Sequence, residues 1–273
     1  MAPGNRSLVQ LIKKWLQSNP QTFLSFQMSR KFRPLDLLSL FSIKRPFLSA
    51  DEIAELSHVP ISTVYRQMKT LRELGMIEAL DRERYRLGGA VSVLDRIARE
   101  ADPLLKAARP VMVRLCKKTK HTVTLTRLFK TDLISVSQEL GRAPIRVGYE
   151  RGEIVPLFYG CTGKITLAHM EWRALKTLFK GNAQQISAAG LGADWKAFLS
   201  TLRDFRSAPY LWTEGEITPE NVAVASPILD EAGRVMGALT VIMPKSNRPS
   251  GIDDKIAIEL QAAVEEVSKN LVV

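Results

Sequence analysis

Cysteine is scarce in this chain of 273 residues, which contains only Cys116 and Cys161. The two lie far apart, and the sequence has no CxxC pair or other cluster with zinc-site spacing. A disulfide-stabilised scaffold and a cysteine-rich metal site are therefore disfavoured, and the composition fits a reducing cytoplasm. A chain of this length buries a sizeable core without such crosslinks.

Long hydrophobic runs are also missing. No stretch approaches the roughly 18 consecutive apolar residues that a membrane-spanning helix needs. The N-terminus lacks the long apolar segment and the small-residue cleavage site of a signal peptide. We therefore expect a cytoplasmic protein with no membrane partner.

Histidine is rare, and His58, His121 and His169 are scattered along the chain. None has a cysteine or carboxylate nearby at the spacing of a metal site. The segment GCTGK, 160–164, does not have the glycine spacing of a phosphate-binding P-loop. Cys161 on this loop suggests either a nucleophile or, more simply, a packing residue. The sequence thus predicts no catalytic residue, no metal and no cofactor.

Positive charge, in contrast, is abundant. The net charge is +11 and the pI is near 9.8, which favours an anionic partner, nucleic acid before an acidic membrane surface. Every charged residue in 1–35 is basic, and residues 1–30 are predicted to be a basic extension. This extension is compatible with a membrane-binding helix, a DNA-contacting arm or a loosely held tail, and a translation start at Met28 would remove it.

Residues 31–88 have the element order of a helix-turn-helix domain. A short helix is predicted over 33–42, and the pattern Ser49-x-x-Glu52 is a capping box that begins the next helix. Pro60 suits the first turn of a third helix.

The third helix is predicted over 60–75, where Gly75 is a favourable residue to end it. Its apolar stripe consists of four residues at helical spacing, Val64, Met68, Leu71 and Leu74. The remaining surface carries hydroxyls and cations, which is typical either of a solvated face or of a helix that reads the major groove. The predicted DNA contacts of the helical part are Ser49, Ser62, Thr63, Tyr65, Arg66, Lys69 and Arg72.

The segment MIEALDRERYRLG, 76–88, predicts a β-hairpin with strands at 76–79 and 84–87. A hairpin directly after a recognition helix is a wing. Its arginines would lie along the DNA backbone or in the minor groove, and they are Arg82, Arg84 and Arg86. This order of elements favours DNA binding over a merely solvated helix.

The segment ADEIAELSHVPISTVYRQMKTLRELGMIEALDRERYRLG closely resembles the winged helix-turn-helix of the IclR family of bacterial transcription regulators. The S-T-V-x-R start of the third helix, the glycine at its end and the Y-x-L-G close of the wing are all present. The resemblance implies that the hydroxyls and arginines of 60–88 face DNA.

The second half of the chain is predicted to be a linker helix, 89–101, followed by an α+β domain, 102–273. Two strand pairs with period-2 alternation, several helices and a closing helix indicate helices packed on a sheet. VPLFYGCTGKITLA and VAVASPILDEAGRVMGALTV resemble motifs of the GAF-like effector-binding domain of the same family. The resemblance spans about 36–270, and it departs at SAPYLWTEGEITPEN, which puts effector specificity in question more than fold.

The resemblance implies that a small organic acid or aromatic compound binds between the sheet and the loop before the GK helix. Amides at a helix N-terminus attract an anion, which suits a carboxylate. Alternatively, Thr162 caps the helix and Lys164 is a solvated lysine. The positions that match the effector site are Cys161, Thr162, Gly163, Ala223, Ala225, Ser226, Thr240 and Ile242.

The function predicted from the sequence is that of an effector-responsive transcription regulator, which is not an enzyme. One helix-turn-helix makes too few contacts for selective binding to an operator, so we expect a homodimer on double-stranded DNA, with pairing into a homotetramer possible in this family. The stripe Val91, Leu94 and Ile97 or Ala98 of the linker is its candidate interface, unless it packs on its own chain. Two rival functions are a metabolite-binding enzyme with an accessory DNA-binding-like domain and a nonspecific basic nucleic-acid binder.

Overall fold

A computed structural model describes residues 33–142, 145–247 and 253–271 of the chain. Among these residues, 33–102 form one compact unit and 103–271 form another. The basic extension predicted for residues 1–30 lies outside the described residues.

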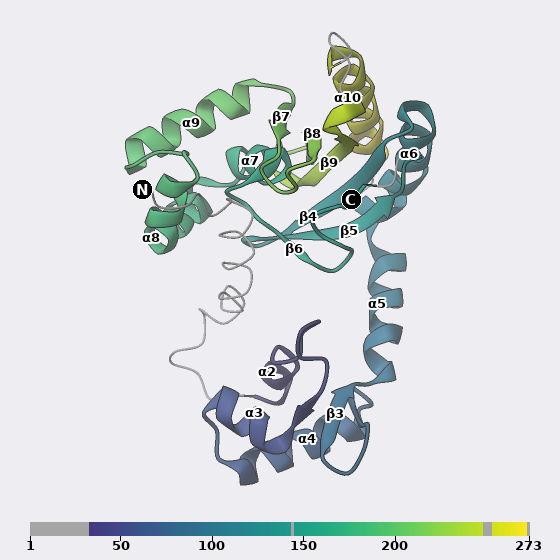
Figure 1. The fold of residues 1–273 in the computed structure, drawn as a ribbon, viewed down its shortest axis with the longest axis vertical. Coiled ribbons are helices and arrows are strands. Elements are labelled where there is room, and N and C mark those ends of the chain that lie inside the picture. Colours follow the sequence, from purple (N-terminus) through teal and green to yellow (C-terminus); the bar gives the residue numbers. More distant parts are fainter. Residues whose placement is uncertain (1–32, 143–144, 248–252, 272–273) are drawn as a thin grey trace, which may run out of the picture. The chain divides into compact units, whose positions relative to one another are not determined.

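The first unit is a small helical domain with a three-stranded antiparallel sheet. Its elements, drawn in purple to blue in Figure 1, are α2 (Pro34–Leu38), β1 (Leu48–Ser49), α3 (Ala50–Ser57), α4 (Ile61–Glu73), β2 (Ile77–Ala79), β3 (Arg84–Leu87) and α5 (Gly89–Ala101). The strand order is β1-β3-β2. A helix-turn-helix followed by a hairpin is therefore confirmed, and the first helix is shorter than the predicted 33–42.

Local sequence signals explain the boundaries of these helices. The capping box of α3 is present, because the Ser49 hydroxyl accepts the Glu52 N–H at 3.1 Å and the Glu52 carboxylate accepts the Ser49 N–H at 2.7 Å. Helix α4 begins after Pro60, and the chain turns away beyond its end at Gly75, whose φ is 66°.

The core of this unit contains Leu37, Ile53 and most of the predicted α4 stripe. Val64, Met68 and Leu71 are at most 2% exposed. Leu74, in contrast, is 62% exposed, so its predicted burial is wrong. The physical reason is that α4 ends at Glu73, which leaves Leu74 beyond the last turn that packs on the core.

The second unit consists of a six-stranded antiparallel sheet covered on both faces by helices. Its strands are β4 (Thr122–Phe129), β5 (Asp132–Glu139), β6 (Ile154–Val155), β7 (Leu211–Glu214), β8 (Asn221–Leu229) and β9 (Val235–Pro244), in the order β6-β5-β4-β9-β8-β7. Its helices are α6 (Pro103–Thr119), α7 (Gly160–Ala168), α8 (Trp172–Ala188), α9 (Trp195–Ser207), the 3-10 turn η1 (Lys245–Asn247) and α10 (Asp253–Lys269). The predicted α+β class is confirmed, whereas the edge strand β7 was not predicted.

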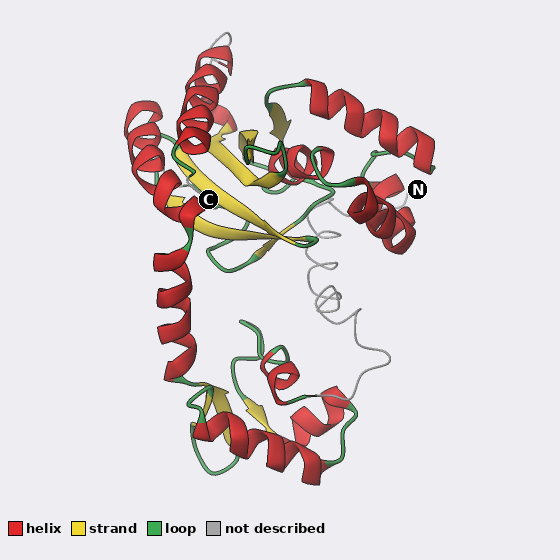
Figure 2. Cartoon of the chain, turned by 180° about the vertical axis from the view of Figure 1, so that it is seen from behind, coloured by secondary structure: helices red, strands yellow, loops and turns green. Residues whose placement is uncertain are grey.

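Strand alternation divides the core of this unit between the two faces of the sheet. Val222 and Val224 pack with α6 and α10 on one face, while Ala223 and Ala225 pack beside α7 on the other. Figures 1 and 2 show α6 and α10 on the same side of the sheet and α7 on the opposite side. Because neighbouring residues of a strand point to opposite faces, only every second residue of β8 faces α7.

Candidate DNA-binding surface and effector pocket

Helix α4 presents a polar row on the surface opposite to its buried stripe. Ser62, Arg66 and Lys69 are exposed, and Tyr65 is 56% exposed, whereas Thr63 is half-buried. Within the described part of the chain, neither the Arg66 guanidinium nor the Lys69 ammonium forms an ion pair. These two cations are therefore available to an anionic partner without breaking an existing contact.

The other predicted contacts of the helical part are engaged locally. The guanidinium of Arg72 lies 6.0 Å from the centre of the Tyr85 ring, a cation–π contact that joins α4 to the wing. The hydroxyl of Ser49 serves as the cap of α3, as described above. Ser49 therefore has the capping role that its sequence pattern predicts, whereas the contact of Arg72 with Tyr85 is visible only in the structure.

The arginines of the wing differ in their surroundings. The Arg84 guanidinium lies 2.7 Å from the Asp81 carboxylate, and Arg86 Nε lies 2.6 Å from Glu78 Oε1 across the hairpin. Arg82 at the tip has no ion-pair partner among the described residues. Two of the three wing arginines are therefore neutralised by carboxylates of the wing itself, in exposed pairs that contribute little to stability.

Asp81 also organises the turn of the wing. Its carboxylate accepts the backbone N–H groups of Glu83 at 3.0 Å and Arg84 at 2.8 Å. These backbone hydrogen bonds, followed by the hydrogen bond from the Arg84 side chain, lower the pKa of Asp81. The turn is therefore stabilised by the ionised carboxylate.

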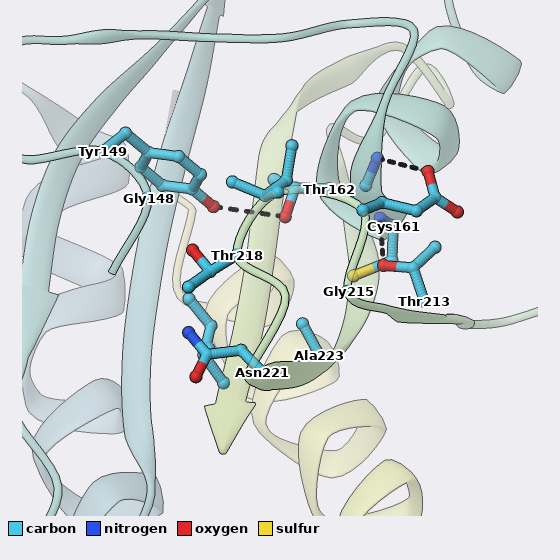
Figure 3. A pocket seen from close by; sticks show the side chains of 13 residues that line it. Gly148, Tyr149, Cys161, Thr162, Thr213, Gly215, Thr218, Asn221 and Ala223 are labelled. Atoms are coloured by element: carbon cyan, nitrogen blue, oxygen red, sulfur yellow. Dashed lines mark hydrogen bonds between the residues drawn. The ribbon is translucent and has the colours of Figure 1, made fainter. Parts of the chain in front are cut away.

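In the second unit, a pocket lies between the beginning of α7, strand β8 and the connection from β7 to β8. Figure 3 shows the labelled residues around this pocket, with the Tyr149 hydroxyl pointing towards Thr162 and Thr213 lying beside Cys161. The full lining consists of Gly148, Tyr149, Gly160, Cys161, Thr162, Thr213, Gly215, Glu216, Ile217, Thr218, Asn221, Ala223 and Ile242.

A series of hydroxyl groups extends from this pocket into the sheet. The Tyr149 hydroxyl lies 3.4 Å from Thr162 Oγ1, which lies 2.8 Å from Thr240 Oγ1 on β9. All three side chains are at least nine-tenths buried. Burial raises the pKa of Tyr149, so its phenol stays neutral and retains a proton to donate.

The first backbone N–H groups of α7 already donate hydrogen bonds to side chains of β7 and of the connection that follows it. The Gly160 N–H donates to the Glu216 carboxylate at 2.9 Å, and the Cys161 N–H donates to Thr213 Oγ1 at 2.9 Å. The other Glu216 oxygen lies 2.7 Å from Lys164 Nζ. The alternative of a solvated Lys164 is therefore wrong, because its side chain is 14% exposed and paired.

Thr162 and Cys161 also resolve two alternatives left open by the sequence. Thr162 does not cap α7, since the N-cap position is Tyr159 and the Thr162 hydroxyl contacts Thr240 instead. Cys161 is 1% exposed, and burial raises the pKa of its thiol to about 11. A thiol that stays protonated and buried is a packing residue rather than a nucleophile.

The structure separates the eight predicted effector contacts into three groups. Cys161, Thr162, Ala223 and Ile242 line the pocket, and Thr240 lies one layer deeper beneath Thr162. The remaining three predicted positions, which are outside the lining, are Gly163, Ala225 and Ser226.

Each of these three departures has a physical reason. Gly163 packs against backbone, because a Cβ built there would lie 2.1 Å from the Pro156 carbonyl oxygen. Ala225 is covered by the side chains around Cys161 and Ile165. Ser226 is two residues after Val224 on β8, so it points to the same face as Val224 and away from α7. Its hydroxyl donates to the Pro209 carbonyl at 2.9 Å.

The pocket residues that sequence reasoning missed come from connections rather than from the recognised motifs. Tyr149 follows β5, and residues 213–218 belong to the segment where the family resemblance departs. Asn221 at the start of β8 donates through Nδ2 to the Arg146 carbonyl at 3.0 Å and thereby holds the segment before Tyr149. The departure of residues 207–221 from the family pattern was the one available signal.

The described residues contain no group of three or more His, Cys, Asp or Glu side chains that could hold a metal ion. In the same residues, no helix is both long enough and apolar enough to cross a membrane.

Comparison with known proteins identifies the two units. Residues 98–269 match the family model described as "Bacterial transcriptional regulator IclR C-terminal", and residues 32–81 match the IclR helix-turn-helix domain. The chain belongs to the IclR family. It is accordingly an effector-responsive DNA-binding transcription regulator.

Individual relatives and solved structures agree with this membership of the IclR family. The p-hydroxybenzoate hydroxylase transcriptional activator of Acinetobacter baylyi is 25% identical over 87% of this chain and 89% of that protein. An IclR regulator from a Silicibacter species has a TM-score of 0.74 at 26% identity, covering 87% of this chain and 94% of its own. An IclR homologue from Microbacterium hydrocarbonoxydans, crystallised with 4-hydroxybenzoate, shares the fold with a TM-score of 0.69 at 20% identity, over 88% of this chain and 97% of that one.

Proposed function

We propose that this IclR-family regulator reads an operator in double-stranded DNA through α4 and the wing. The observation that carries the proposal is the exposed row of α4, in which Arg66 and Lys69 are unpaired among the described residues. A bidentate contact from arginine to guanine is the commonest specific contact in the major groove, while lysine later in the helix suits phosphate. Arg82 at the tip of the wing supplies a further cation for the DNA backbone.

The test is DNA binding to the protein's own upstream intergenic region, with excess nonspecific competitor and salt near the physiological level. Arg66→Ala should lower operator affinity about 10- to 100-fold, as expected for the loss of a base contact worth roughly 1–3 kcal/mol. The matched control is Arg203→Ala, which removes an exposed arginine of α9. Unchanged operator affinity in Arg66→Ala would exclude α4 as the recognition helix.

The same assay discriminates the nonspecific alternative. A basic binder without sequence preference loses its DNA to the competitor, and its affinity falls for all DNA when residues before Met28 are removed. An operator-specific regulator retains the complex in competitor and depends on Arg66. The enzyme alternative predicts turnover of the bound small molecule, which product analysis by mass spectrometry detects.

We further propose that a small organic acid or aromatic compound binds in the pocket at α7, in the cytoplasm where the operator is found. Support comes from the buried hydroxyls of Tyr149 and Thr162 and from the Microbacterium structure with 4-hydroxybenzoate. The test adds organic acids and aromatic compounds to the operator-binding assay and measures the change in the regulator's affinity for the operator. Thr162→Val should weaken this response, whereas Thr177→Val on the exposed surface of α8 should leave it unchanged.

We infer that the regulator acts as a homodimer that buries α5, with tetramers formed by pairing of dimers. Helix α5 buries none of its side chains within the described residues, and Val93, Leu94 and Ile97 are 51–58% exposed. The apolar stripe predicted for the linker helix included Val91, but Val91 is half-buried. The exposed apolar residues of α5 are instead Val93, Leu94 and Ile97. Sedimentation equilibrium tests this: Ile97→Asp should shift the protein towards monomer, and an unchanged mass would exclude α5 as the interface.

A further inference from the structure

The effector pocket is nearly filled by the protein's own side chains. The free interior is about 40 Å³, which is room for a few water molecules. By comparison, an apolar protein cavity that binds benzene measures roughly 150 Å³. An effector of the proposed class therefore enters only when part of the lining moves out.

The connection from β7 to β8 supplies the apolar part of this filling. We call residues 215–218 of this connection the strap. The Ile217 side chain lies between two glycines, because a Cβ built on Gly148 would lie 2.2 Å from Ile217 Cγ2 and one built on Gly160 would lie 2.9 Å from Ile217 Cγ1. Ile217 thus occupies a slot that exists only because both flanking residues lack a side chain.

The strap also supplies a negative charge. The Glu216 carboxylate accepts the Gly160 N–H at 2.9 Å and contacts Lys164 Nζ at 2.7 Å. The side chains of Glu216 and Lys164 are 25% and 14% exposed, so this ion pair is largely withdrawn from water. The lining itself contains no lysine, arginine or histidine, and Lys164 is the cation that Glu216 neutralises.

We propose that the strap is a built-in occupant of the effector pocket, and that the effector is a monocarboxylate with a compact apolar body that displaces Glu216 and Ile217. This inference rests on the proposed effector site at α7. When Glu216 leaves, Lys164 and the Gly160 N–H lose their partner at a poorly hydrated position. A neutral ligand leaves that charge unpaired, whereas a carboxylate replaces both contacts and the apolar body fills the slot of Ile217.

The consequence is a two-state pocket. With the strap in place, Glu216 competes with any incoming carboxylate for the same cation. A ligand shifts this equilibrium only through contacts that it makes in the open state and not in the closed one. Glu216 is therefore the residue that determines the selectivity of the pocket for anions, and Ile217 determines access for the apolar body.

The experiment compares benzoate with benzamide, its neutral counterpart of the same shape, by calorimetry on the full-length chain. Glu216→Gln keeps the size of the side chain but cannot neutralise Lys164. It should bind benzoate about tenfold more tightly than the wild type, a difference of roughly 1.4 kcal/mol, with no gain for benzamide. The double variant Glu216→Gln with Lys164→Met should lose the gain.

Two further variants isolate the strap. Glu214→Gln removes a carboxylate of β7 that pairs with Lys245 outside the lining, and it should leave both affinities unchanged. Ile217→Ala opens the slot without changing any charge, so it should increase the affinity for benzoate and benzamide alike. Ile217→Ala also decides the matter if Glu216→Gln fails to fold, which circular dichroism reports.

The inference is overturned if Glu216→Gln binds benzoate no more tightly than the wild type does. It is equally overturned if the variant gains as much affinity for benzamide as for benzoate. It is also overturned if Ile217→Ala increases the affinity for neither benzoate nor benzamide. Operator binding is measured separately on the same proteins without ligand. If the wild-type protein shows no specific DNA binding, the proposed function is refuted. The benzoate comparison still decides the role of the strap, because it does not depend on DNA.

Discussion

Replacement of Gly163 by alanine distinguishes a packing glycine from a ligand-contacting one. A Cβ at this position would lie 2.1 Å from the Pro156 carbonyl oxygen and 2.8 Å from that of Leu157. Both obstacles are backbone atoms, so no side-chain rotation relieves the overlap. Either α7 moves away from residues 156–157 or those residues shift. Movement of α7 also displaces Cys161 and Thr162, which line the pocket.

The magnitude follows from two opposing effects. In a helix, alanine is favoured over glycine by about 1 kcal/mol, while overpacking of a dense core costs typically 1–3 kcal/mol and sometimes more. Because the clash involves rigid backbone, we expect Gly163→Ala to lower the free energy of unfolding of the second unit by about 2 kcal/mol. For a domain of this size, that corresponds to a decrease in Tm of roughly 4–8 °C.

Gly181 provides the matched control in α8. It lies directly before the kink of α8 at Asn182, and a Cβ built there meets no atom within 4 Å. Gly181→Ala should therefore be neutral or stabilising by up to about 1 kcal/mol. The contrast between the two variants separates steric overlap from the general effect of replacing glycine.

The assay is urea unfolding followed by tryptophan fluorescence. Three of the four tryptophans, Trp172, Trp195 and Trp212, lie in the second unit, and Trp15 is replaced by phenylalanine in every variant so that the signal reports on the domain that contains α7. Operator binding should persist at low temperature, because the core of the winged helix does not include α7. Gly163→Ala with wild-type stability would refute the steric argument and return Gly163 to the ligand-contacting set.

Three further predictions concern the wing, the pocket thiol and the response to acid. Glu78→Gln frees Arg86 from its cross-strand pair, so nonspecific DNA affinity measured by fluorescence anisotropy should rise and its salt dependence should steepen by about one phosphate contact; an unchanged salt slope would exclude Arg86 from the DNA interface. Native Cys161, with a pKa of about 11, should be alkylated by iodoacetamide at least ~100-fold more slowly than in urea, by mass spectrometry, and equal rates would contradict its burial. Burial lowers the pKa of His169, so below about pH 6.5 the unfolded chain binds a proton that the folded chain resists. The free energy of unfolding should fall as pH decreases through that range, and less so in His169→Gln; identical profiles would exclude this histidine as a cause.

The winged helix shows how much local sequence signals reveal. The signals Ser49-x-x-Glu52, Pro60 and Gly75 act on residues close to them in the sequence. The start of α3 and both ends of α4 could therefore be predicted, and they are confirmed to within one or two residues. The exposed row of Arg66 and Lys69 follows from the same periodicity. The failure at Leu74 arose because periodicity shows which side of a helix is apolar but not where the core beneath it ends.

The pocket at α7 shows the opposite limit. Motif resemblance located α7 and β8, and four of the eight predicted residues line the pocket. Tyr149 and the strap were not predicted, because they belong to connections with no periodicity and no recognised motif. Ser226 was misplaced by the change of face that occurs at every successive residue of a strand.

The sequence by itself determined the family, the order of the elements and the polar surface of α4, because these depend on caps, periodicity and motifs that act over short distances. Only the tertiary structure decided which charges are free. Glu216 is 52 residues from Lys164 along the chain, yet their side chains form one ion pair. Arg86 is neutralised by Glu78 only because the hairpin places the two opposite each other. Pairing of charged groups depends on distances in space, which the folding of distant segments creates.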